Sequence, residues 1–196
     1  MKKKSPNKSP KKPKSSGLLR GVALVEKALK KRAEEEELEG SESLPDDFKL
    51  SPSLKAWLEK DDTFFTLGEP TPIGELLRDE FGEDWGSYFE EVEALLNKGD
   101  CVLFEGWGSD SRRFIYLGAK DSLGEYPVFT VDTDDTPYVC LNGPVDVWLA
   151  QQAGAIAGEK VYGWLPAAYE ASRLELAKKC FKGFIAHVDG AFSREL

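Results

Sequence analysis

Few residues in this sequence have a type and spacing that could carry out chemistry. The single histidine, His187, lies two residues before Asp189, and such a pair could transfer a proton or bind a metal ion. Two side chains do not complete a metal site, so a partly packed histidine is the favoured interpretation. The sequence also contains no G-x-S-x-G nucleophile motif and no G-x-x-x-x-G-K-[ST] phosphate loop.

Two loop segments resemble ion-binding turns but lack essential parts of them. Residues 106–113 combine glycines with Arg112 and Arg113, as a phosphate-binding turn does, but the third glycine and a following helix are missing. Residues 132–135 alternate carboxylates as a calcium loop does, but the glycine and the distal glutamate are absent. We therefore predict a hairpin loop and an exposed acidic turn, with no metal ion and no cofactor.

Carboxylates and tryptophans leave two further possibilities open. Glu105, Glu125 and Asp132 could supply an acid–base pair for a hydrolase, provided that the fold brings two of them within about 10 Å. Trp107, in a glycine-rich turn, and Trp164, before a proline, are the tryptophans that we expect at the surface. The other tryptophans fit the apolar stripes of predicted helices and belong in the core: Trp57, Trp85 and Trp148.

Charge is distributed very unevenly along the 196 residues. The first 20 residues hold eight of the 26 Lys and Arg residues and none of the 35 Asp and Glu residues, which leaves the remainder with a formal charge of −17. Residues 1–17 contain three prolines and only Met1 as an apolar residue, so we expect a disordered tail. Such a tail predicts weak, non-specific binding to polyanions.

The candidate catalytic and binding residues must be positioned by helices and strands. The periodicity of the apolar residues predicts where these elements lie. Apolar residues at helical spacing predict a charged helix over residues 18–38, followed by a linker at 40–44. Ser51-Pro52 and Thr71-Pro72 are typical helix starts, and Gly82 is a typical helix stop. Three further helices are predicted over residues 84–97, 145–153 and 166–181.

Between these helices the periodicity shortens to that of strands. Four runs rich in β-branched and aromatic residues recur at intervals of about ten residues: 101–105, 113–117, 128–131 and 138–141. The turns between them are too short for crossover helices, so the strands form an antiparallel meander. The predicted fold is therefore α+β, with a central mainly antiparallel sheet of four or more strands and helices packed on one side.

The length after the linker fits one domain. We predict a tail at residues 1–17, a charged helix and linker at 18–43 that stands apart from the core, and a single domain at 44–196. Three irregularly spaced cysteines argue against a disulfide framework, and we expect a cytoplasmic protein. The apolar stretch after the tail is broken by charges, and no run approaches 18 apolar residues, so neither a signal peptide nor a membrane span is expected.

Residues 44–153 contain a series of patterns in a recognisable order. The series is Leu44-Pro45-Asp46-Asp47-Phe48, then Gly108-Ser109-Asp110 leading into 113–118, then 127–132, and finally Val145-Asp146-Val147-Trp148-Leu149. This order resembles the SUKH superfamily, which groups bacterial immunity proteins of polymorphic toxin systems with a fungal cell-wall-synthesis regulator. The resemblance implies an α+β binding protein that occupies a partner toxin, often a nuclease, or serves as a regulatory scaffold, and it supplies no catalytic residues.

These observations predict a protein-binding module that is not an enzyme. The expected partner is a basic toxin domain, because opposite charge accelerates encounter with an acidic body. The expected partner-binding residues lie in two loops at one end of the sheet: Trp107, Asp110, Asp132, Asp134 and Asp135. A regulator that associates with nucleic acid through its tail and a carboxylate-dependent hydrolase are the alternatives.

Overall fold

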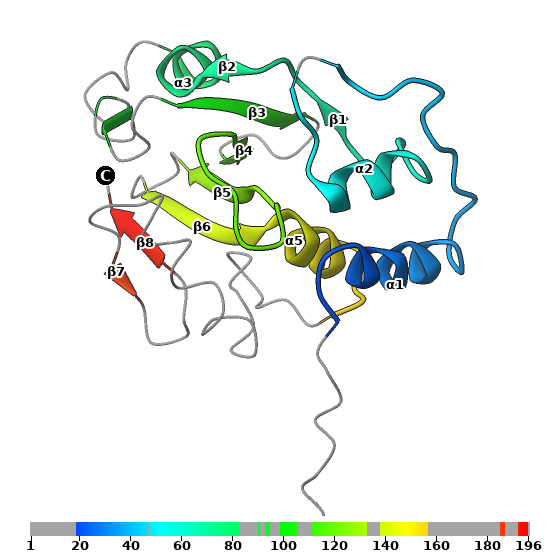
Figure 1. Ribbon diagram of the computed structural model, residues 1–196. Helices are drawn as coiled ribbons and strands as arrows, with labels where there is room; N and C mark the ends of the chain where they lie inside the picture. The colour runs from blue at the N-terminus through cyan, green and yellow to red at the C-terminus, as the bar shows by residue number, and fades with distance from the viewer. Residues whose placement is uncertain are drawn as a thin grey trace, which may run out of the picture.

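A computed structural model describes residues 19–46, 48–82, 90, 93–94, 99–105, 111–132, 138–156, 185–186 and 192–195 (Figure 1). These residues form an antiparallel sheet with helices packed against it, so the predicted α+β class is confirmed. The predicted tail at 1–17 and the predicted helix at 166–181 lie outside the described residues. The predicted helix at 84–97 lies almost entirely outside them.

The centre of the sheet is the predicted meander. Its strands are β3 (Asp100–Glu105), β4 (Ser111–Tyr116), β5 (Pro127–Asp132) and β6 (Tyr138–Pro144). Each pairs antiparallel with the next one along the chain. Short connections allow only this arrangement, because a parallel neighbour would require a long crossover.

Four short strands extend the meander at its two edges. Both β1 (Thr66–Leu67) and β2 (Thr71–Pro72) pair with β3, whereas β8 (Phe192–Glu195) pairs with β6 and β7 (Ile185–Ala186) pairs with β8. Pro70 and Pro72 interrupt the outer edge beside β3. A proline cannot donate a ladder hydrogen bond, so this edge is poorly suited to pairing with another sheet over its whole length.

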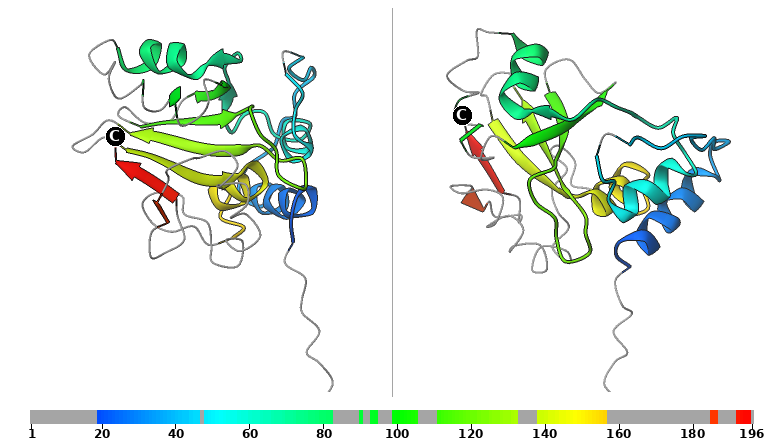
Figure 2. Two further views of the ribbon diagram at one scale, coloured as in Figure 1. Left: turned by 60° about the vertical axis from the view of Figure 1, so that its left-hand side comes forward. Right: turned by 45° about the horizontal axis from the view of Figure 1, so that its top comes forward.

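Alternate side chains of the meander face two separate clusters, so helices lie on both faces of the sheet. On β3, Cys101 packs with α3 (Ile73–Phe81), whereas Val102 and Phe104 pack with α1 (Val22–Arg32), α2 (Pro52–Leu58) and α5 (Val145–Gln152). Figure 2 shows α3 separated from the other three helices by the strands. The prediction of helices gathered on one side therefore holds for α1, α2 and α5 but not for α3.

Local signals set two of the predicted helix ends, the start of α2 and the end of α3, whereas the predicted start at Thr71-Pro72 was wrong. The Ser51 hydroxyl accepts a hydrogen bond from the N–H of Leu54 at 3.3 Å, and Pro52 is the first residue of α2. Gly82 ends α3 with a positive φ of 86°, which glycine adopts without strain. Thr71-Pro72 forms β2 instead of a helix cap, and α3 begins directly after it.

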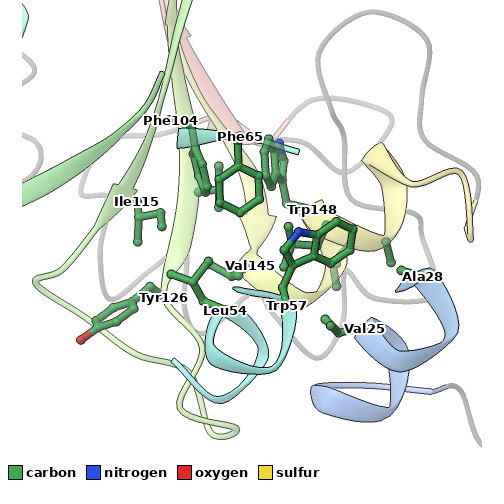
Figure 3. Close-up of a cluster of buried hydrophobic side chains, with 14 of the residues drawn as sticks. Val25, Ala28, Leu54, Trp57, Phe65, Phe104, Ile115, Tyr126, Val145 and Trp148 are labelled. Carbon is green, nitrogen blue, oxygen red and sulfur yellow. The ribbon is translucent and has the colours of Figure 1, made fainter. Parts of the chain in front are cut away.

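The helix α5 is buried nearly all the way round. All of its residues from Val145 to Gln151 are buried, since the sheet and α2 cover one side and α1 covers another. Figure 3 shows Trp148 among side chains from α1, α2 and the sheet, together with Phe65, which directly precedes β1. Its ring stacks on that of Phe104 with centroids 4.4 Å apart.

Helix α1 is shorter than predicted and belongs to the core. It ends at Arg32 rather than near residue 38, and Leu24, Val25, Ala28 and Leu29 are all buried in the cluster around α5. The run of glutamates from Glu34 to Glu37 follows the helix as a turn, as expected for like charges that repel one another. The expectation that this helix stands apart from the core is therefore corrected.

Both ends of α1 are attached to α5. The N–H of Gly21 donates to the Asp146 Oδ2 atom at 2.7 Å, at the start of α5. The Nζ atoms of Lys27 and Lys31 donate to the carbonyl oxygens of Ala155 and Gly154, each at 2.8 Å, just beyond its end. The two helices therefore run parallel, and the two lysines satisfy carbonyls at the negative end of α5.

Candidate functional site

The predicted partner-binding residues lie mostly outside the described part of the chain. Trp107, Asp110, Asp134 and Asp135 lie outside the described residues, and so do His187 and Asp189. Asp132 is the last residue of β5 and is half-buried. Its Cα partner is Ser111 at the start of β4, so the strand ends that carry the two loops lie next to each other. The predicted site in those loops stays a prediction.

The described residues instead contain an open groove beside β1. It has a volume of about 370 Å³ and lies between the linker that follows α1 and the segment that joins α2 to β1. Its apolar side chains come from both segments: Leu44, Pro45, Leu58, Phe65 and Leu67. Its polar side chains are Ser41, Ser43, Asp62 and Thr66.

Backbone hydrogen bonds hold the two walls of the groove together. The N–H of Ser41 donates to the Leu58 carbonyl at 2.8 Å, and the N–H of Asp62 donates to the Glu39 carbonyl at 2.8 Å. Gly40, which lies between Glu39 and Ser41, is very close to the end of α2. A Cβ atom on Gly40 would be 2.2 Å from the Glu59 carbonyl oxygen. Only glycine fits this approach, so Gly40 fixes the linker against α2.

Arg32 connects the end of α1 to the same wall. Its Nε atom lies 2.6 Å from the Oδ2 atom of Asp61, whose side chain is fully buried. The other Asp61 oxygen accepts from the N–H and hydroxyl groups of Thr63, and the Arg32 guanidinium lies 4.3 Å from the centre of the Phe64 ring. A buried carboxylate needs a cation and hydrogen bonds of this kind, so the turn at 61–64 has a fixed shape.

The back of the groove is rigid because it belongs to the larger core. Phe65 packs edge-on against Phe104 with ring centroids 4.9 Å apart, and it also contacts the rings of Trp57 and Trp148. Leu58 is buried at the end of α2. The apolar part of the groove is therefore preformed, and a ligand would not have to order it.

Exposed carboxylates occur in and next to the segments that line the groove. Glu42 lies between the lining residues Ser41 and Ser43, Asp46 follows Pro45, Glu59 follows Leu58, and all three side chains are exposed. Asp62 lines the groove itself and is also exposed. The surrounding sequence is also negatively charged, because residues 33–48 contain eight acidic residues and no Lys or Arg. The exposed Lys60 is a basic residue within the α2 wall.

The groove could not be predicted from the sequence, because neither of its walls has a recognisable motif of its own. Residues 40–44 were predicted as a linker, and residues 59–65 have no regular periodicity. The available signal was compositional, namely a long acidic stretch directly before the apolar pair Leu44-Pro45. Only the backbone hydrogen bonds from Ser41 to Leu58 and from Asp62 to Glu39 show that this stretch lies against the segment that carries Phe65 and Leu67.

Two buried carboxylates accept hydrogen bonds from backbone N–H groups at the starts of helices. The Oε1 atom of Glu125 accepts the N–H of Ser53 at 3.1 Å in the first turn of α2. Asp146 accepts the N–H of Gly21, as described above. Burial raises the pKa of Asp146 to about 6; the hydrogen bond from Gly21 opposes this shift, and the nearby charge of Glu125 adds to it. Glu125, one of the carboxylates considered for a hydrolase, therefore has a structural role here.

The groove can bind a ligand but holds no described catalytic group. Its apolar floor would take aliphatic side chains or prolines, and its carboxylates would accept hydrogen bonds from Lys or Arg. Within the described ranges, His, Cys, Asp and Glu side chains do not gather in groups of three or more that could hold a metal ion, and no helix is long and apolar enough to cross a bilayer. Comparison with known proteins found no matching family model, curated protein or solved structure.

Proposed function

We propose that this chain is a protein-binding module, not an enzyme, which recognises a basic partner through the groove beside β1. The observation that carries the proposal is a groove with a preformed apolar back, which Asp62 lines and whose lining segments carry further exposed carboxylates. Interfaces commonly combine an apolar centre with a polar or charged rim. The formal charge of −17 after residue 20 would accelerate the encounter with a basic protein.

The partner class that we propose is a toxin domain, with this chain as its cytoplasmic immunity protein. Support comes from the SUKH-like order of patterns in residues 44–153 and from the acidic surface, which suits the basic surface of a nuclease. The loops that contain Trp107, Asp110, Asp134 and Asp135 would add a second contact region at the end of the sheet. On this proposal the alternative as a hydrolase has little support, because Glu125 binds the start of α2.

A second candidate is a regulatory or scaffold protein that associates with nucleic acid through its tail. The eight basic residues among the first 20 favour it, since they would release counterions from a polyanion. Nucleic acid would then be the main ligand and the groove a secondary one.

Co-expression tests the immunity proposal directly. The C-terminal domain of any large secreted protein encoded next to this chain is expressed in a bacterial host, with and without the full chain. We expect the domain to stop growth alone and this chain to restore growth. The double variant Glu42→Lys with Asp62→Lys should lower the association rate about tenfold at low salt, whereas Glu75→Lys on α3 should leave it unchanged.

Failure of rescue by a well-expressed chain would argue against immunity. If rescue succeeds but the double variant and Glu75→Lys bind equally well, the partner binds elsewhere, and the loops at the sheet end become the next site to test. Each of these side chains is exposed, so loss of folding should not confuse the comparison.

A further inference from the structure

We propose that the N-terminal segment of this chain docks in the groove beside β1, so that the protein covers its own binding surface. The docking residues are Pro10-Lys11-Lys12-Pro13-Lys14. This inference concerns the free protein and does not depend on which partner, if any, competes for the groove.

The chemistry of the segment matches the chemistry of the groove. Pro10 and Pro13 have the spacing of a polyproline II ligand, in which two prolines share one face and lie on an apolar surface. Prolines also restrict the free segment, which lowers the entropy lost on docking. The half-buried side chains of Leu44, Pro45 and Leu67 offer such a surface, and the buried Leu58 and Phe65 support it from behind.

The charges are complementary as well. Lys11, Lys12 and Lys14 accompany the two prolines, and the first 20 residues contain no acid. The exposed Asp62 lines one wall of the groove, and the exposed Glu42 lies between the lining residues Ser41 and Ser43 of the other wall, so both are available to the lysines beside the proline pair.

The segment is long enough to reach the groove within one molecule. The end of α1 is beside the groove, because Arg32 contacts Asp61, the neighbour of the lining residue Asp62. The start of α1 is one helix length away, and 11 residues at 1.5 Å per residue give about 16 Å. Residues 14–18 can span about 17 Å when extended, and residues 10–18 about 30 Å, so the proline pair lies within reach.

Carbodiimide cross-linking of the full-length chain tests the proposal. The reagent joins a lysine Nζ to a carboxylate that it contacts, and mass spectrometry of tryptic peptides identifies the pair. We expect links from Lys11, Lys12 or Lys14 to Glu42 or Asp62, in a yield that does not change when the protein is diluted tenfold. The variant Pro10→Ala with Pro13→Ala keeps every charge and should lower this yield at least fivefold.

Matched controls separate docking from general attraction. Pro6→Ala alters a proline of the same tail outside the docking segment, and Glu75→Lys alters a carboxylate on the other face of the sheet; both should leave the yield unchanged. In ¹⁵N spectra of the full chain, the amides of Ser41 and Thr66 should shift in the double proline variant but not in Pro6→Ala.

Two results would overturn the inference. If the tail lysines link equally well to Glu75 or Asp79 on α3, or if the double proline variant behaves like the wild type, the tail is held only by diffuse charge. If the yield falls in proportion to dilution, the groove binds the tail of a second copy, and docking within one molecule is wrong. Neither result affects growth rescue by the chain, so failure here is distinguishable from failure of the proposed function.

Discussion

Asp146 is fully buried, and its carboxylate links the start of α5 to the start of α1 through the hydrogen bond from Gly21. Its pKa is raised from 3.8 to about 6 by burial, with Glu125 adding to the shift, so folding takes up a proton between these two values. The charged form opposes folding, and the contribution of this group to stability is fully present below pH 3.8 and is lost as the pH rises through 6. The difference is at most about 3 kcal/mol, at 1.36 kcal/mol per pKa unit.

We therefore predict that Asp146→Asn flattens the pH dependence of the free energy of unfolding between pH 4 and pH 7. The variant keeps an oxygen that can accept from the N–H of Gly21 while removing the buried charge. Urea titrations at several pH values would measure this, with Asp79→Asn on the surface of α3 as the control. The assignment is wrong if the wild-type slope persists in Asp146→Asn.

At the scale of elements, α1 is the part whose role differs most from its sequence pattern. Removal of residues 1–17 should leave the melting temperature within about 2 °C of the wild type, because a segment whose only apolar residue is Met1 adds little to a core. Removal of residues 1–40 should cost about 5 kcal/mol or more, since it uncovers the core surfaces that Leu24, Val25 and Leu29 bury. That is comparable with the whole stability of a typical domain, so we expect this shorter chain to lose its cooperative unfolding transition.

Thermal melting followed by circular dichroism would compare the two truncations. The full chain with Lys30→Met provides a further control. Lys30 is exposed on α1, so this substitution alters the surface of the helix without uncovering the core. A chain without residues 1–40 that melts cooperatively near the wild-type temperature would show that the rest of the core is sufficient.

Elements bounded by local signals were predictable from the sequence, and elements bounded by distant partners were not. Ser51-Pro52 starts α2 and Gly82 ends α3 through contacts within a few residues. In contrast, β1 and β2 have two residues each and exist only through pairing with β3, whose partner residues come 28 to 39 positions later. The groove needs both that pairing, which places β1, and the hydrogen bonds of Ser41 and Asp62 with Leu58 and Glu39, which join its walls. Each wall could be located in the sequence, but the contact between the two walls could not.

Considered as a whole, the molecule combines a basic end with an acidic body, and this arrangement predicts how it responds to salt. We expect the full chain to bind single-stranded DNA weakly at 50 mM salt and to lose at least tenfold in affinity by 200 mM, because phosphate neutralisation by lysines releases counterions. A chain lacking residues 1–17 should not bind at either concentration. Fluorescence anisotropy with a labelled oligonucleotide would measure both.

Binding that survives removal of the tail would place a polyanion site on the body, despite its formal charge of −17 after residue 20. A variant with Lys11, Lys12 and Lys14 changed to Gln should show an intermediate loss. The same variant would show whether the lysines proposed to dock in the groove also contribute to the affinity for nucleic acid.

The attachment of α1 to α5 has a consequence for the order of events during synthesis. The hydrogen bonds that join these helices span 123, 125 and 128 residues of sequence. A ribosome adding 5–20 residues per second makes α5 about 6 to 25 s after α1, and an 11-residue helix is barely stable alone in water. The apolar stripe of α1 therefore leaves the ribosome long before its binding surface exists, and during that interval it is a candidate substrate for chaperones.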